Sequence, residues 1–232
     1  FSMENLILQQ FFVFTFSERH DKMCSYLYFS FLRGQTMDSN FFALISRMRY
    51  IARWGLMRNA LPENIQEHSH MVAVLAHALG VIRRDIFHQP CDVNALATAA
   101  LYHDASEILT GDLPTPIKYH NAEIMSAYHA VEDLAVQKLL GMLPPELRET
   151  YADVLAEDKD GDIYPLVKAA DKLSAYIKCI EERKAGNNEF LSAEAQTRAA
   201  LEASPLPEVQ YFLEHFIPAF ERDLDELGAI GQ

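Results

Sequence analysis

Apolar side chains recur every three or four residues through most of this 232-residue chain, and this period limits its fold more than any other feature. In the segment of about residues 64–83, for example, Val72, Leu75 and Leu79 fall on one side of a helix. No run alternates apolar and polar residues in the way that a half-buried strand does. The pattern therefore predicts an all-α fold.

Capping residues, glycines and prolines mark where the helices begin and end. Asn94 is predicted to cap one helix, and Gly141 to follow another as its first residue in the left-handed conformation. In the first helix, Phe42 and Met48 are expected to share one face. The first predicted helix starts near residue 40. The others cover about 64–83, 94–109, 122–140, a short stretch from 145, 165–184, 192–203 and 207–227.

The first 36 residues differ from the rest, because they mix aromatic and charged side chains without a sustained period. Met37 then reads as a good chain start directly before a capped helix. We therefore predict one domain at residues 37–232 and an extension at residues 1–36. The extension is either a genuine N-terminal element or a stretch that is non-native or lies upstream of the natural start.

Net charge and cysteine content limit the possible partners and the compartment. The formal net charge of −13 argues against a nucleic-acid platform, because the chain repels phosphate backbones. The three cysteines are far apart, which fits a reducing cytoplasm. No apolar run reaches the roughly 18 residues that a membrane helix needs. We expect a cytoplasmic protein that binds neither nucleic acid nor membrane.

Three short stretches place polar side chains inside otherwise apolar helices. They are Glu67-His68-Ser69, the segment His103–Glu107, and Lys168–Lys172. Two imidazoles and two carboxylates from these stretches form a complete set of ligands for a divalent ion and leave positions open for water and substrate. Taken alone, His68 could be a hydrogen-bonded core histidine and Asp171 a partner of Lys172.

The flanking residues make the pattern more specific. The chain carries Arg53-Trp54, Glu67–Ser69, Tyr102–Glu107, Leu109–Pro116 and Gly186–Phe190. A histidine, a distant His-Asp pair and a distant aspartate, all on helices, resemble the HD superfamily of metal-dependent phosphohydrolases. Together with the flanking stretches they resemble its bacterial 5′-deoxynucleotidases, the YfbR-like branch, over about residues 37–227.

This resemblance implies a compact multi-helix HD-domain fold, a homodimer and a set of site residues. One divalent cation, whether Co, Mn, Mg, Zn, Ni, Cu or Fe, would be bound by His68, His103, Asp104 and Asp171. Arg53 would orient the phosphate, and Trp54 would lie against the sugar and disfavour a 2′-hydroxyl. The substrate-binding residues that the resemblance implies are Arg53, Trp54, Asp104, Asp112, Leu113, Pro114, Thr115 and Asp171.

The resulting hypothesis is hydrolysis of deoxyribonucleoside 5′-monophosphates to deoxyribonucleoside and phosphate. In it Arg53 offsets charge on the phosphoryl oxygens, and Glu107 or Asp112 carries the proton transfers. One alternative is a triphosphohydrolase or phosphodiesterase, against which the few basic residues argue. Another is a non-catalytic nucleotide-binding regulatory module, against which the intact ligand set argues.

Overall fold

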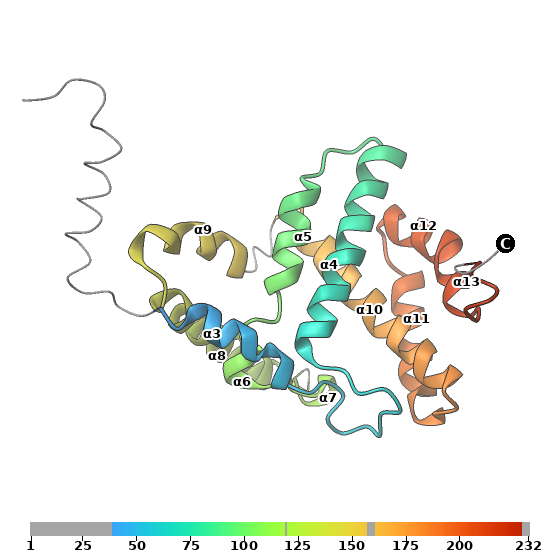
Figure 1. Ribbon diagram of the computed structural model, residues 1–232, viewed down its shortest axis with the longest axis horizontal. Coiled ribbons are helices and arrows are strands. Elements are labelled where there is room, and N and C mark those ends of the chain that lie inside the picture. Colours follow the sequence, from blue (N-terminus) through green and yellow to red (C-terminus); the bar gives the residue numbers. More distant parts are fainter. Residues whose placement is uncertain (1–38, 119, 157–160, 229–232) are drawn as a thin grey trace, which may run out of the picture. The chain divides into compact units, whose positions relative to one another are not determined.

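The computed structural model describes residues 39–118, 120–156 and 161–228, which Figure 1 draws in colour. The predicted extension at residues 1–36 lies outside these residues, so its separation from the domain stays a prediction. The side chains of Thr115 and Pro116 lie outside them as well.

All the helices and strands assigned in the described residues are helices and none is a strand, which confirms the predicted all-α fold. An isolated antiparallel bridge joins Ala52 to Asn64. The elements in chain order are α3 (Phe41–Ile45), η2 (Ser46–Tyr50), α4 (Ile65–Val81), η3 (Ile82–Ile86), α5 (Val93–Tyr102), α6 (Glu107–Thr110), α7 (Thr115–Lys118), α8 (Ala122–Gly141), α9 (Pro145–Leu155), α10 (Tyr164–Lys184), η4 (Asn188–Phe190), α11 (Leu191–Glu202), α12 (Pro207–His215) and α13 (Ile217–Phe220).

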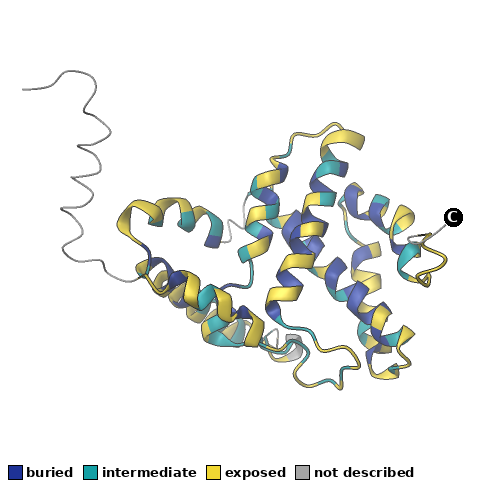
Figure 2. Cartoon of the chain, in the orientation of Figure 1, coloured by how far each residue is buried: buried dark blue, intermediate teal, exposed yellow. Residues whose placement is uncertain are grey.

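The larger hydrophobic cluster joins α4, α5 and α10, and α11 to α13 add side chains to it. Figure 2 shows how strongly buried residues concentrate on α4 and α10. Leu79 on α4 and Leu173 on α10 are fully buried, and each contributes about 1.5–3 kcal/mol by leaving water. Gly80 lets α4 approach α5 closely, since a Cβ there would lie 3.0 Å from Leu96 Cδ2. This packing fixes α4 relative to α10.

A second, smaller cluster lies between α3, α8 and α9. Its fully buried members include Phe41, Leu139 and Ala105. Ala105 belongs to the turn between α5 and α6, directly after the predicted His103-Asp104 ligand pair. The backbone of that pair is thus anchored in one cluster, while His68 projects from a helix of the other.

Several helix boundaries differ from the predictions. The segment predicted as one helix over 94–109 is broken at residues 103–106, and its first helix is capped by Asp92 rather than Asn94. Gly141 is the last residue of α8, not a left-handed residue after it. The helix predicted over 207–227 ends at His215, and a second short helix begins at Ile217, with Pro218 in its first turn.

The predicted inward face of the first helix is also corrected. Phe42 is 53% exposed, whereas its neighbour Phe41 is fully buried in the second cluster. The helix switches to 3₁₀ geometry after Ile45, which changes which residues share a face. Met48 is buried, as predicted.

Candidate active site

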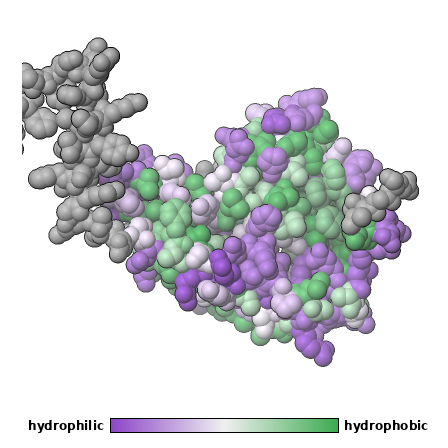
Figure 3. Space-filling model, in the orientation of Figure 1, coloured by the Kyte–Doolittle hydropathy of each residue, from purple (hydrophilic) through white to green (hydrophobic). Residues whose placement is uncertain are grey.

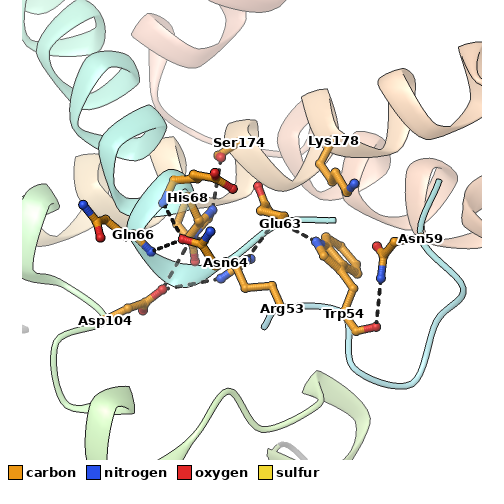
Figure 4. Close-up of polar contacts among 12 residues, drawn as sticks. Arg53, Trp54, Asn59, Glu63, Asn64, Gln66, His68, Asp104, Ser174 and Lys178 are labelled. Atoms are coloured by element: carbon orange, nitrogen blue, oxygen red, sulfur yellow. Dashed lines mark hydrogen bonds and ion pairs between the residues drawn. The ribbon is translucent and has the colours of Figure 1, made fainter. Parts of the chain in front are cut away.

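Three segments far apart in the sequence bring the predicted ligands together. His68 lies in the first turns of α4, His103 and Asp104 lie in the turn after α5, and Asp171 lies on α10. The side chain of Asn64 accepts hydrogen bonds from the backbone N–H groups of Gln66 and Glu67, which fixes the start of α4 one turn before His68. Figure 4 shows this helix start beside Asp104 and Ser174.

The turn that carries His103 and Asp104 has a local cause. The His103 ring Nδ1 lies 2.8 Å from the carbonyl oxygen of Ala100, near the end of α5. The next backbone bonds span three residues, from Ala105 N–H to the Tyr102 carbonyl and from Glu107 N–H to the Asp104 carbonyl. The imidazole therefore bonds a carbonyl that would otherwise serve a continuing helix.

The ligand atoms of His68, His103 and Asp171 all lie within 4.8 Å of one another, as in a metal site. His68 Nε2 is 3.0 Å from Asp171 Oδ1. The Asp104 Oδ2 atom lies 3.2 Å from His103 Nε2 and 3.6 Å from His68 Nε2. The structure therefore brings all four predicted ligands to one place.

The hydrogen bonds on the far side of each ring show which nitrogen is available. A carbonyl only accepts, so His103 Nδ1 carries the proton that bonds Ala100, and Nε2 is the nitrogen that remains for a ligand. His68 Nδ1 lies 3.1 Å from the Ser174 hydroxyl, which can accept in the same way. Both Nε2 atoms are buried and lack a hydrogen bond of acceptable geometry among the described residues. Two such nitrogens facing carboxylates fit a bound cation.

Electrostatics in the site favour ionised carboxylates. Burial alone would raise the pKa of Asp104, but His103, His68 and Arg53 outweigh it and hold that pKa well below its usual range. Burial acts in the same way on Asp171, and the adjacent imidazole of His68 outweighs it and lowers the pKa of this carboxyl. Both carboxylates are therefore ready to bind a cation without first losing a proton.

Arg53 and Trp54 lie beside the ligand cluster, on the segment between η2 and α4. The Arg53 guanidinium is 3.4 Å from Asp104 Oδ2 and 3.1 Å from Glu63 Oε2. The Trp54 indole N–H donates to the same Glu63 oxygen at 2.9 Å, as Figure 4 shows. Trp54 also packs edge-on against Phe190, with ring centroids 5.3 Å apart.

The segment after Trp54 is fastened to α10 by a buried ion pair. Glu182 is fully buried and accepts hydrogen bonds from the backbone N–H groups of Ala60 and Leu61. Lys178, which is 4% exposed, bonds both Glu182 and the Leu61 carbonyl. Breaking one half of such a pair leaves an uncompensated buried charge. The segment that carries Arg53 is therefore held to the same helix as Asp171.

Glu107 and Asp112 are two further carboxyls close to the cluster, and both interact with Asp104 and Arg53. Burial raises the pKa of Glu107 to about 9, and the charges of Asp104 and Asp112 add to the rise. Its Oε2 atom is buried without a hydrogen bond among the described residues. Burial likewise raises the pKa of Asp112, against the opposing charge of Arg53 and a bond from the Trp54 backbone. A buried carboxyl that holds its proton at neutral pH can donate it.

A cavity of 610 Å³ lies beside the His103-Asp104 turn, and neither His68 and Asp171 nor Arg53 and Trp54 line it. His103 and Asp104 form part of its wall, and α8 and α10 supply most of the rest. It is large enough for a nucleotide-sized ligand. Among its charged lining residues are Lys118, His129, Glu132, Asp133 and Lys168.

The remaining predicted substrate-binding residues belong to one loop, and the structure describes only some of their side chains. Leu113 and Pro114 are half-buried in the loop between α6 and α7, and the side chain of Thr115 is not among the described ones. Sequence reasoning did not assign Glu63 and Ser174 to the site. Ser174 follows Asp171 by one helical turn, so its spacing was a usable signal. Glu63 lies in a segment without periodicity, where no spacing rule applies.

None of the helices in the described part of the chain combines the length and the apolar character needed to cross a bilayer.

Comparison with known proteins gives a consistent result. The chain matches the family described as 5′-deoxynucleotidase YfbR-like over residues 40–220. It is 50% identical over 192 residues to the 5′-deoxynucleotidase YfbR of Escherichia coli and, to the same extent, to that of Shigella boydii. Each alignment covers 82% of this chain and 96% of the relative.

Solved structures of HD-domain phosphohydrolases share the fold. One from Listeria innocua has a TM-score of 0.70 and 25% identity, covering 80% of this chain and 90% of its own. Another, from cyanophage S-2L, is bound to dA and one catalytic Zn²⁺ ion; it has a TM-score of 0.50 and 26% identity, covering 79% of this chain and 96% of its own.

Proposed function

The chain belongs to the YfbR-like 5′-deoxynucleotidases, and from this premise we propose that it hydrolyses deoxyribonucleoside 5′-monophosphates at the cluster around His68. It is a metal-dependent phosphomonoesterase of the HD-domain phosphohydrolases. The observation that carries the local assignment is the pair of buried, unbonded Nε2 atoms of His68 and His103 facing Asp171.

We assign the divalent cation to His68, His103, Asp104 and Asp171. The zinc in the cyanophage relative supports a cation in this fold, while the identity of the metal in this chain stays open. When bound, such a cation supplies Lewis acidity, which lowers the pKa of water and polarises a phosphate oxygen. Asp104 also lies 3.4 Å from Arg53, so one carboxylate faces both the cation and the phosphate-binding guanidinium.

Hydrolysis joins a water oxygen to phosphorus and breaks the bond from phosphorus to the 5′ oxygen. The water loses a proton, and the 5′ oxygen gains one. Arg53 binds the phosphoryl oxygens through its remaining donors and offsets their charge. Glu107, which holds a proton at neutral pH in its buried place, is our first choice as donor to the leaving oxygen, with Asp112 as the alternative.

We assign the sugar to the side of Trp54 and the nucleoside to the loop Asp112–Thr115. An apolar indole face offers a ribose 2′-hydroxyl no hydrogen bond, and burying that hydroxyl unpaired costs on the order of 1–3 kcal/mol. Discrimination from this source is roughly ten- to a hundred-fold in kcat/KM. Asp112, Leu113 and Pro114 belong to the loop that would contact the nucleoside.

The experiment is a phosphate-release assay with deoxy- and ribonucleoside mono-, di- and triphosphates and added divalent metals. We expect release from the deoxy monophosphates, at least tenfold above the ribo counterparts. Trp54→Ala should narrow that gap by admitting the ribo substrate, whereas Arg53→Ala should depress both substrates together. Preferential attack on triphosphates or diesters, or binding without release, would favour the alternative functions.

We further propose a cytoplasmic homodimer. Cys91 and Cys179 are both free thiols, which supports the cytoplasmic part of the proposal. Figure 3 shows apolar side chains gathered over the region of α4 and α5, and the exposed apolar residues of these helices include Met71, Val74 and Leu101. Sedimentation of the purified protein over a range of concentrations tests this, and a monomer throughout would contradict it.

A further inference from the structure

Glu63 occupies an unusual place beside the site, because a single carboxylate oxygen accepts from two neighbouring side chains. Its Oε2 atom lies 3.1 Å from Arg53 Nε and 2.9 Å from Trp54 Nε1. The Glu63 side chain is 15% exposed and that of Arg53 13%, so water competes little for either bond. The two side chains that the proposed function assigns to phosphate and sugar therefore share one anchor (Figure 4).

The backbone repeats this link. The Arg53 N–H donates to the Glu63 carbonyl at 3.0 Å, and the Ile65 N–H donates to the Ile51 carbonyl at 3.0 Å. These bonds form the small antiparallel bridge between residues 52 and 64. Glu63 thus holds Arg53 by main chain and side chain together.

Trp54 is held in a conformation that a bulky residue avoids. Its φ angle is +58°, in the left-handed region, which costs on the order of 1–3 kcal/mol. The bond to Glu63, the edge contact with Phe190 and bonds from Met57 N–H and Asn59 to the Trp54 carbonyl hold it there. The guanidinium carbon of Arg53 lies 5.9 Å from the centre of the indole, so the two groups are close neighbours.

From this geometry we infer that Glu63 is a positioning residue that sets sugar selectivity by fixing the indole of Trp54 relative to the guanidinium of Arg53. The inference rests on the proposed function, in which these two side chains contact the same nucleotide. With Glu63 absent, Arg53 keeps its contact with Asp104 and still binds phosphate. The indole loses its N–H partner and no longer defines the space for the sugar.

The test compares Glu63→Ala with a matched control, Glu208→Ala. Glu208 is buried and, like Glu63, accepts from an arginine Nε, that of Arg83, at 2.6 Å, but it joins α12 to η3 rather than elements of the site. Both variants lose a carboxylate that is paired with an arginine. Deoxy and ribo kcat/KM values, metal content and the emission of Trp54, the single tryptophan of the chain, are measured for each.

We expect Glu63→Ala to narrow the deoxy-to-ribo ratio by about tenfold, as expected for losing one bond to a charged acceptor. Its metal content should be unchanged and its emission maximum shifted. Glu63→Gln keeps a neutral acceptor and should give an intermediate deoxy-to-ribo ratio. If the alanine variant does not fold, the ratio of Glu63→Gln tests the inference in its place. Glu208→Ala should lower the melting temperature without changing the ratio or the emission.

A wild-type ratio in Glu63→Ala, or an equal change in Glu208→Ala, would overturn the inference. A wild-type protein without a deoxy preference would instead overturn the proposed function. In that case the positioning role of Glu63 can still be tested by titration with deoxyadenosine 5′-monophosphate, monitored by the emission of Trp54. Equal emission and equal affinity in wild type and Glu63→Ala would then overturn the positioning role.

Discussion

The two histidines of the cluster differ from an ordinary buried histidine in what their two ring nitrogens contact. In each ring Nδ1 lies within hydrogen-bond distance of an oxygen, from Ser174 or from the Ala100 carbonyl, and Nε2 faces carboxylates. The sequence alone left the core-histidine interpretation of His68 open, because burial is common to both roles. The contacts in space favour metal binding, since two buried Nε2 atoms that face carboxylates and lack a hydrogen bond of acceptable geometry are the arrangement expected around a cation.

Asp171→Asn tests the assigned ligand set at this scale. The amide has no charge, so we expect metal occupancy and phosphate release to be lost while helical content is kept. Adding metal stabilises only a protein that binds it, so the rise in melting temperature expected for wild type should be absent in this variant. Asp153→Asn, which changes an exposed carboxylate on α9, is the control. Full metal occupancy in Asp171→Asn would remove Asp171 from the ligand set.

Glu107 gives a pH prediction. Burial raises its pKa from the ordinary 4.5 to about 9, so between these values the folded state binds a proton that the unfolded chain has released. Stability therefore falls as the pH rises through this window. Glutamine cannot ionise, so metal-free Glu107→Gln should melt above metal-free wild type at pH 8, by a margin that shrinks toward pH 5.

The same variant tests the catalytic role of Glu107. Metal-loaded Glu107→Gln should keep its metal but lose at least about a hundredfold in kcat. Parallel curves of melting temperature against pH for wild type and variant would contradict the raised pKa. Near-normal phosphate release would move the proton transfer to Asp112.

At the scale of elements, the sequence predicted helices better than it predicted their interruptions. The long helix α10 was predicted to within one residue of its start and to its last residue, because its apolar period is unbroken; Gly186, which follows it, has a positive φ of 83°. The break at residues 103–106 was missed because its cause is a side-chain bond from His103 to the Ala100 carbonyl, which leaves no mark in the apolar pattern. The ligand types could be predicted from motifs, whereas Glu63 could not, because its partners come together only in the folded chain.

Replacing Gly111 or Gly141 with alanine should change the free energy of unfolding in opposite directions. Gly111, after α6, has φ 74° and ψ 161°, a region that only glycine visits readily. Gly141 is helical at the end of α8, and a Cβ at either position would meet nothing within 4 Å. Gly111→Ala should therefore cost about 1–3 kcal/mol and raise KM by displacing Asp112. Gly141→Ala should gain about 0.5–1 kcal/mol without changing KM. Urea unfolding and steady-state kinetics check both, and equal effects would contradict the conformational argument.

For the described part of the chain as a whole, the site depends on the packing of both clusters. Asp171 and the anchor pair Lys178–Glu182 belong to α10, so one helix positions both a proposed metal ligand and the segment that carries Arg53. Ala105 ties the His103-Asp104 turn to the second cluster. The formal net charge of −13 leaves the local cation and Arg53 to attract a phosphate.

This dependence on the clusters leads to a prediction about chain length. Among the described residues, the buried members of both clusters lie between Phe41 and Ile217, and the family match spans residues 40–220. A shortened chain beginning at Met37 should therefore melt within about 2 °C of the full chain, a difference of less than about 1 kcal/mol, and keep its kcat/KM. Phe41→Ala is the contrasting variant, because it removes a fully buried ring and should cost about 3–5 kcal/mol. If shortening the chain lowers the melting temperature as much as Phe41→Ala does, residues 1–36 contribute to the core and the predicted boundary at Met37 is wrong.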